Sequence, residues 1–231
     1  MSEIAVIIPA LNEAGNLFRL IGEVRSTVNA DIIVVDNGST DETADEAIRA
    51  GAQLIQEPRR GYGYACAAGV AASEGSEILV FLDGDFSSLP SEIPALVNPI
   101  QSGEADLVQG SRVLGHIAAG AMPFQQRFGN WIASRLMNFL YGSRITDLGP
   151  FRAIRKSLLS TLNMREMTYG WPTEMTVKAQ RRGARIKEVP VSFHPRQAGH
   201  SKISSTLRGT ILAGWYIMGV TLRYAWGSWD D

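Results

Sequence analysis

The sequence predicts an α/β fold in which a mostly parallel central sheet is flanked by helices. Short apolar runs rich in β-branched residues alternate with segments of helical periodicity through the first half of the chain. The runs are apolar along their whole length, which is typical of strands covered on both faces. Because strands joined through helices pair in parallel, this alternation favours a layered fold with the sheet in the middle.

The first half contains five predicted strands with a helix after each of the first four. Leu17, Leu20 and Val24 recur at helical spacing after the first strand. Ser39 and Glu42 have the spacing of a capping box at the start of the second helix. An alanine-rich helix follows the third strand, and a fourth helix covers residues 91–103. The predicted strands are residues 3–9, 31–36, 52–57, 77–85 and 105–111.

The second half is less regular and predicts helices over residues 123–142, 171–183 and 205–226, and a strand over 185–193. The last helix has 14 uncharged residues between Arg208 and Arg223, fewer than the about 20 that span a bilayer. It is therefore a helix that docks on the domain or one that lies in a membrane interface. We expect a C-terminal helical extension, residues 204–231, after a domain over residues 1–203.

The helix over 123–142 carries its large apolar residues on one stripe. Such a stripe packs on a core or contacts a membrane, and the sequence alone leaves both open, with the core favoured. The stripe consists of Phe124, Phe128, Trp131, Ile132, Leu136, Phe139 and Leu140.

The net charge of −1 hides a strong polarity between the two halves. Residues 1–108 hold 17 acids and 5 bases, whereas residues 109–231 hold 6 acids and 17 bases. The basic half indicates an anionic partner such as a phosphate group or a membrane surface. Motifs for nucleic-acid binding are missing from the sequence, so we expect no nucleic-acid partner. A single cysteine and an N-terminus without signal-peptide features predict a cytoplasmic protein. A peripheral position at the cytoplasmic membrane face is the alternative that the basic half leaves open.

Acidic residues follow two of the predicted strands. Asp83 and Asp85 end the fourth strand, and side chains two apart on an extended chain point the same way. They can therefore share one divalent cation, because Mg²⁺ binds one or two carboxylates together with substrate phosphates. Asp36 ends the second strand, where an acid can bind a nucleotide. The alternatives are a solvated turn for the pair and an Asx turn for Asp36.

Five motifs in order then carry a family resemblance: "VIIPALNE", "VVDNGSTDET", "GYGYACAAG", "FLDGD" and "QGSR". The chain resembles family 2 glycosyltransferases with the GT-A fold over about residues 3–203. "DLGPFRAIRKSLL" and "HPRQAGHSK" are similar to the branch that transfers sugars to dolichyl or polyprenyl phosphate. The resemblance implies a nucleotide-diphosphate sugar donor, a lipid-phosphate acceptor and Mg²⁺ or Mn²⁺.

The resemblance also implies roles for single residues. Asp83 and Asp85 would hold the metal, and Arg112 and Arg127 would bind the acceptor. Asp85 and Glu174 would be catalytic, with Glu174 taking a proton if the acceptor is a sugar hydroxyl. The residues that would bind the nucleotide sugar are Pro9, Leu11, Glu13, Asp36, Gly61, Asp83, Asp85, Arg196, Ser201 and Lys202.

Three departures from the family pattern concern the substrate. Asn37 stands where an acid is frequent, Ser87 stands where the lipid-phosphate branch often has glutamine, and the C-terminal tail is short. We expect an inverting displacement in which an acceptor oxygen attacks the sugar while a cation stabilises the leaving diphosphate. The rival hypotheses are transfer to a soluble hydroxyl acceptor, a nucleotidyltransferase on a similar fold, and a non-catalytic nucleotide-sugar-binding protein. Arg112 or Arg127 could instead cover the sheet or pair with Asp147.

Overall fold

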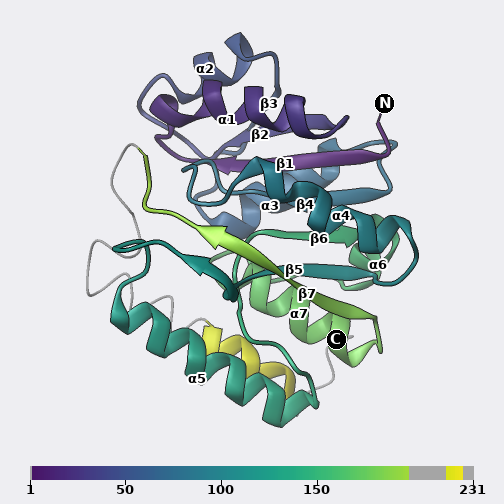
Figure 1. Cartoon of the computed structure of the whole chain (residues 1–231). Helices are drawn as coiled ribbons and strands as arrows, with labels where there is room; N and C mark the ends of the chain where they lie inside the picture. Colours follow the sequence, from purple (N-terminus) through teal and green to yellow (C-terminus); the bar gives the residue numbers. More distant parts are fainter. Residues whose placement is uncertain (1, 198–216, 226–231) are drawn as a thin grey trace.

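The computed structural model of the chain describes residues 2–197 and 217–225, and within them the strands form one seven-stranded sheet (Figure 1). The strand order is β3-β2-β1-β4-β6-β5-β7. The strands are β1 Ile4–Ala10, β2 Asp31–Asp36, β3 Gln53–Gln56, β4 Ile78–Phe81, β5 Leu107–Ile117, β6 Arg152–Arg155 and β7 Ile186–Phe193. The helices are α1 Ala14–Thr27, α2 Thr43–Arg49, α3 Tyr62–Ala72, α4 Ile93–Gln101, α5 Phe124–Tyr141, α6 Lys156–Thr161 and α7 Trp171–Arg181, with a 3₁₀ turn at Pro90–Glu92.

The sheet is mostly parallel, as predicted. Strands β3, β2, β1 and β4 run in one direction, and β5 is parallel to β7. The exception is β6, which pairs antiparallel with both β4 and β5. Sequence analysis missed β6 because its four residues, two of them arginines, give no apolar run. The predicted mixed α/β architecture is confirmed.

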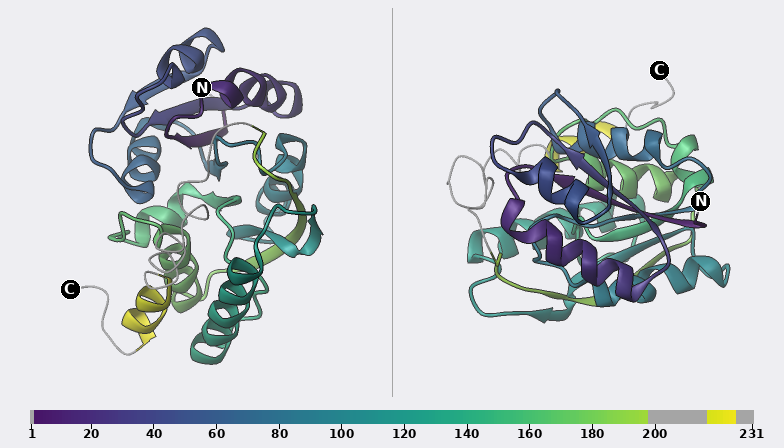
Figure 2. Two further views of the ribbon diagram at one scale, coloured as in Figure 1. Left: turned by 90° about the vertical axis from the view of Figure 1, so that its left-hand side faces the viewer. Right: turned by 90° about the horizontal axis from the view of Figure 1, so that it is seen from above.

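Both faces of the sheet are covered, so the strands alternate between two cores. Val6 and Ile8 of β1 pack in a cluster with α1 and α4. Ala5 and Ile7 of the same strand pack in a second cluster with α3 and α7. This alternation explains why the strands are apolar along their whole length, and two further views show helices on either side of the sheet (Figure 2).

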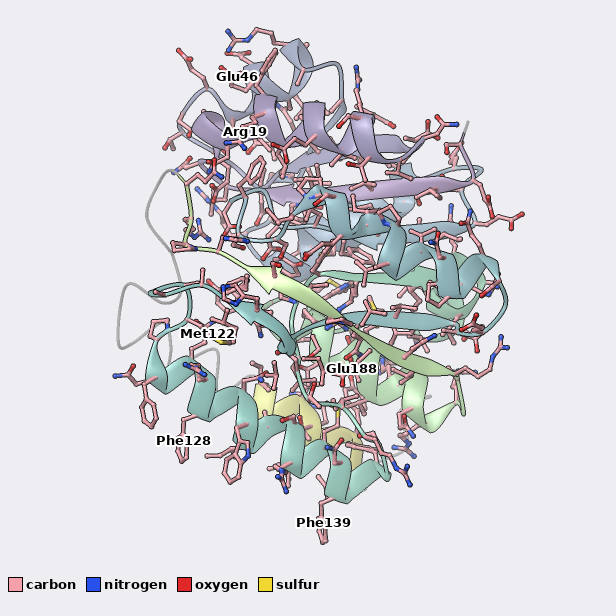
Figure 3. All side chains as sticks on the ribbon, viewed as in Figure 1. Arg19, Glu46, Met122, Phe128, Phe139 and Glu188 are labelled. Atoms are coloured by element: carbon pink, nitrogen blue, oxygen red, sulfur yellow. The ribbon has the colours of Figure 1, made fainter. Side chains whose placement is uncertain are left out.

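Helix α5 packs differently from the core position favoured by sequence analysis. Its buried residues are Ala133, Ser134 and Met137. Ala133 and Met137 belong to a third cluster with α7 and residues 217–225. The aromatic stripe faces outward, and Phe128 and Phe139 point away from the body of the molecule (Figure 3). The core position is therefore wrong for this stripe, because α5 packs on the domain through its opposite face.

The C-terminal helix is described only over residues 217–225, where Val220 and Tyr224 are buried. The rest of the helix predicted over 205–226, and the predicted boundary between 203 and 204, lie outside the described residues. Among the described helices, none combines the length and the hydropathy needed to cross a bilayer.

Candidate active site

The carboxyl ends of β1, β2 and β4 meet at one edge of the sheet. Ala10 at the end of β1 lies opposite Asp36 at the end of β2, and β4 runs parallel to β1 on its other side. A Cβ added to Gly84 would lie 3.4 Å from the carbonyl oxygen of Pro9 and 3.5 Å from Cγ of Glu13. The loop after β4 is therefore packed directly against the loop after β1, which brings together acids that are 70 residues apart in sequence.

Three carboxylates and one guanidinium form the centre of this edge. Arg196 reaches in from the segment after β7 and binds Glu13 (Nη1–Oε1, 2.8 Å) and Asp85 (Nη2–Oδ2, 2.9 Å). The other oxygen of Asp85 accepts the backbone N–H of Ser87 at 2.9 Å. Asp83 accepts a hydrogen bond from the hydroxyl of Tyr62 at 3.2 Å. Three acids against one base leave an excess of negative charge at this edge.

The pKa values of two of these acids reflect that excess. Burial and the neighbouring charge of Asp85 raise the pKa of Asp83 from 3.8 to about 7. Burial raises the pKa of Glu13, with a further contribution from Asp85, although Arg196 opposes both. A cation at this edge would stabilise the ionised carboxylates against both burial and their mutual repulsion.

The donor set fits a magnesium or manganese ion that also binds its substrate. Asp83 and Asp85 offer carboxylate oxygens, the ligands that Mg²⁺ prefers. Among the described residues, no three His, Cys, Asp or Glu side chains are arranged to hold an ion by themselves. If such an ion binds at this edge, Asp83 and Asp85 would supply two carboxylates, and water or a phosphate group would supply the other ligands.

The raised pKa of Asp83 predicts a pH-dependent stability in the absence of metal. Between pH 4 and 7 the native state keeps a proton that the unfolded chain has released, so this stabilisation is full below pH 4 and is lost as pH rises through 7. We expect Asp83→Asn to raise the melting temperature in EDTA, more at pH 8 than at pH 5. Thermal unfolding at both pH values measures this, with Asp45→Asn on the exposed face of α2 as the control. An equal effect at the two pH values would contradict the assignment.

Asp36 and Asn37 lie at the same edge, where β2 ends. Asp36 accepts the backbone N–H of Ser39 at 2.8 Å, which is the Asx turn considered above, while its second oxygen accepts no hydrogen bond from a described residue. The amide of Asn37 donates to the carbonyls of Glu57 (3.0 Å) and Arg59 (2.7 Å), and its oxygen accepts the N–H of Gly61 at 2.9 Å. An aspartate could not make the two donor bonds, which is a physical reason for asparagine at this place.

Pro9, Leu11 and Gly61 border the same edge. Pro9 and Leu11 are half-buried where β1 ends. Gly61 precedes α3 with φ +149°, and a Cβ there would lie 2.3 Å from the carbonyl oxygen of Met167. Only glycine fits both the backbone angle and this close approach.

Gly63 provides a test of this packing. A Cβ on Gly63 would lie 2.4 Å from the backbone oxygen of Glu166 and 2.5 Å from Cα of Met167, neither of which can move aside freely. We expect Gly63→Ala to lower the free energy of unfolding by about 1–3 kcal/mol. Urea unfolding measures it against Gly22→Ala in α1, which has open space and should be neutral or stabilising. Equal stability of the two variants would show that the 166–167 segment is not held there.

Arg112 lies near this centre but is strongly engaged. Its Nε and Nη2 bind the two oxygens of Asp147 at 2.7 and 2.6 Å, so the predicted alternative of pairing with Asp147 is found. Burial lowers and Asp147 raises the pKa of Arg112, with a net rise to which Asp83 also contributes. No described residue accepts from Nη1 of Arg112. The ion pair therefore orients the guanidinium and leaves one amino group for an anion.

The remaining predicted residues lie apart from the carboxylates. Arg127 is exposed on α5 and has no ion pair with another described residue. Ser201 and Lys202 lie outside the described residues.

Glu174 is fully buried at the start of α7. It pairs with Lys178 at 2.8 Å and accepts the hydroxyl of Tyr224 at 2.6 Å. Its oxygens also accept the N–H groups of Arg165 and Glu166, at 3.0 and 2.8 Å. A general base must reach the acceptor oxygen, and this carboxylate is surrounded by donors on every side. The catalytic role predicted for Glu174 does not fit its surroundings, which are those of a structural anchor.

Two residues near the site were missed by sequence analysis. Tyr62 binds Asp83, and burial together with Asp83 raises its pKa. Arg152 of β6 is buried and pairs with no carboxylate of residues 2–197 or 217–225. It donates to the carbonyl of Pro172 at 2.7 Å, and burial lowers its pKa to about 10. An arginine in a short strand is only weak evidence of a buried arginine near a site, because most arginines are exposed.

Residues 5–162 match the family model described as Glycosyl transferase family 2. An uncharacterized glycosyltransferase of Mycobacterium bovis is 37% identical over 210 residues, which cover 91% of this chain and 94% of that protein. The undecaprenyl-phosphate mannosyltransferase of Micrococcus luteus is 31% identical, over 96% of both chains. The polyprenol monophosphomannose synthase of Mycolicibacterium smegmatis is 32% identical, over 93% of this chain and 87% of its own.

Solved structures with the same fold include glucosyl-3-phosphoglycerate synthase from Mycobacterium tuberculosis in complex with Mn²⁺, uridine diphosphate and glucosyl-3-phosphoglycerate. It is 24% identical with a TM-score of 0.77, and the match covers 96% of this chain and 79% of that one. The same enzyme in complex with phosphoglyceric acid matches with a TM-score of 0.78 at 24% identity, over 96% of this chain and 79% of that one.

Proposed function

The chain belongs to glycosyl transferase family 2 and is a glycosyltransferase with the GT-A fold, and from this premise we propose its substrates and its chemistry. We propose that it moves a sugar, with inversion, from a nucleotide-diphosphate sugar to a polyprenyl- or dolichyl-type lipid phosphate. The observation that carries the proposal is the acidic edge at Glu13, Asp83 and Asp85, with Arg196 as its counter-charge.

The donor is assigned to this edge by its charges. Asp83 and Asp85 would hold Mg²⁺ or Mn²⁺, which when bound supplies the positive charge that stabilises a departing diphosphate. Arg196 already lies between two of the acids, and a diphosphate arriving there is a bidentate partner for its guanidinium. Pro9, Leu11, Asp36 and Gly61 border the same edge, and the open oxygen of Asp36 is a ready acceptor for a nucleoside hydroxyl.

Two features of the described residues support a phosphate as the acceptor. A phosphate is anionic near neutral pH and attacks without a strong base, whereas a sugar hydroxyl needs one. Glu174, the predicted base, has its oxygens occupied by four partners. Nη1 of Arg112 and the exposed Arg127 are donors that suit a phosphate. The names of the relatives from Micrococcus luteus and Mycolicibacterium smegmatis support the same substrate class.

The test compares acceptors under matched conditions. The full chain is incubated with nucleotide sugars and Mn²⁺, and with a polyprenyl phosphate, the corresponding polyprenol or a soluble hydroxyl acceptor. We expect transfer to the polyprenyl phosphate alone, loss of transfer in EDTA, and a product whose anomeric configuration is opposite to the donor's by NMR. Preference for the soluble acceptor would remove the lipid-phosphate assignment, and full turnover in EDTA would remove the metal. The cytoplasmic location stays a prediction, and contact with a membrane is treated next.

A further inference from the structure

Helix α5 exposes a continuous aromatic surface. Phe124 is 75% exposed, Phe128 50%, Trp131 53% and Phe139 85%. The rings of Phe124 and Phe128 stack at 6.1 Å, and those of Phe128 and Trp131 at 6.0 Å. With Ile132 these four residues are called the α5 stripe. Exposing so many large apolar side chains to water is unfavourable. A stripe of this extent on one helix marks a contact surface.

The stripe lies opposite the face that holds α5 to the domain. At 100° per residue, its members fall within one side of the helix, whereas the buried Ala133, Ser134 and Met137 fall on the other side. The stripe extends over about 22 Å from its first to its last residue. Phe128 and Phe139 both point outward (Figure 3), and α5 lies at the end of the molecule opposite α1 and α2 (Figure 2).

The charge around the stripe identifies its partner as anionic. Residues 107–146 contain no aspartate or glutamate. Arg127 and Arg135 are exposed on α5, and Arg144 is exposed just after it. The guanidinium of Arg135 lies 5.6 Å from the centre of the Trp131 ring, so the bases are interleaved with the aromatic rings. Aromatic residues beside arginines, without acids, are the composition of helices that lie in the interface of an anionic membrane.

A second copy of the chain fits this surface less well. If two copies met through their α5 stripes, Arg127 and Arg135 of one copy would lie near Arg127 and Arg135 of the other. Helix α5 contains no acid that could compensate this repulsion. Crossing a bilayer is also excluded for α5, since none of the described helices is long and apolar enough. A helix that exposes aromatic rings on one side and is held to the domain on the other can bind a membrane by lying along the membrane surface.

We propose that the α5 stripe, with Arg135 and Arg144, binds the surface of an anionic phospholipid bilayer, with α5 lying in the plane of the interface. The lipid headgroups pair with the arginines, and the aromatic rings enter the boundary between headgroups and acyl chains. This surface goes beyond the proposed sugar transfer, because it requires neither the donor nor the lipid-phosphate acceptor.

The test measures binding to vesicles that contain neither substrate. The full chain is sedimented with vesicles of phosphatidylglycerol and phosphatidylcholine, and with vesicles of phosphatidylcholine alone. We expect binding to the anionic vesicles that weakens with added salt. Phe128→Gln combined with Phe139→Gln should reduce it on the order of tenfold or more. The matched control is Phe18→Gln combined with Ile48→Gln, which removes two apolar residues that are 56% and 59% exposed on α1 and α2. This control should bind vesicles as the wild type does.

Two further measurements separate the outcomes. Arg135→Gln with Arg144→Gln should remove the preference for anionic lipid, and Trp131→Phe should remove part of the blue shift of tryptophan emission on vesicle binding. Donor hydrolysis in solution should stay unchanged in the variant that combines Phe128→Gln with Phe139→Gln. Unchanged hydrolysis also shows that this variant is folded. Vesicle binding equal to wild type in that variant would overturn the proposal. A dimer that becomes monomeric in it, without vesicle binding by the wild type, would assign the surface to a second copy instead.

A failure of this test is distinguishable from a failure of the proposed function. Transfer to a polyprenyl phosphate dissolved in detergent does not need a bilayer, and vesicle binding does not need a sugar. Each can therefore be found without the other.

Discussion

Asp85→Asn is expected to reduce sugar transfer by about 10²–10³-fold while the protein remains folded. The substitution removes one negative charge from the edge where the diphosphate is proposed to bind. The asparagine keeps an oxygen that can accept the N–H of Ser87, and Arg196 keeps its ion pair with Glu13. Both groups that contact Asp85 therefore still have a partner in the variant. Steady-state transfer with saturating Mn²⁺ gives the rate, and thermal unfolding gives the stability.

Asp45→Asn is the matched control, since it removes the same charge from an exposed position of α2. A manganese titration followed by melting temperature adds a readout that is independent of turnover, because a bound ion stabilises the native state. We expect the wild type and Asp45→Asn to be stabilised and Asp85→Asn to respond weakly. Full transfer by Asp85→Asn, or an unchanged response to manganese, would remove Asp85 from the metal site.

Glu174→Ala is expected to lower the free energy of unfolding by about 3–5 kcal/mol. Glu174 and Lys178 are both fully buried and pair at 2.8 Å, so removal of the carboxylate leaves an ammonium group in the interior without its counter-charge. The backbone N–H groups of Arg165 and Glu166 and the hydroxyl of Tyr224 lose the same acceptor. Urea unfolding measures the loss.

A surface pair of the same chemistry is the control. Glu104 and Lys187 also pair at 2.8 Å but are 59% and 47% exposed, and Glu104→Ala should leave the melting temperature almost unchanged. Replacing both buried partners, Glu174→Leu with Lys178→Met, should recover much of the stability, because no charge is then left buried. If Glu174→Gln instead unfolded like the wild type and lost only its rate of transfer, Glu174 would be the base predicted from sequence.

Much of the site could be predicted because it depends on strand ends. Asp36 and Asp83 each follow an apolar strand, and the carboxyl ends of parallel strands meet at one edge. The role of Asn37 could not be predicted, although the residue was noticed as a departure. Its three hydrogen bonds reach a segment 20 to 24 residues away, and a single sequence carries no signal of that contact.

Two predictions on the second half depended on packing that periodicity does not reveal. The stripe of α5 has the spacing of a core face. Helical periodicity shows only that the apolar residues lie on one side of the helix, and it does not show whether that side packs on the domain or faces outward. Glu174 was assigned a chemical role by resemblance, whereas its burial follows from contacts with residues 163–168 and with the helical residues 217–225.

Local patterns in the chain were sufficient for the α/β class, for most strands and helices and for the acids at the strand ends, because hydrophobic period and turn residues act within a few positions. Contacts across the chain decided the rest: Arg196 meets Glu13 from 183 positions away, β6 enters the sheet antiparallel, and α5 turns its aromatic rings outward. These depend on which surfaces meet when the chain is compact, and the free energy of each such contact belongs to a pair of distant residues rather than to either one.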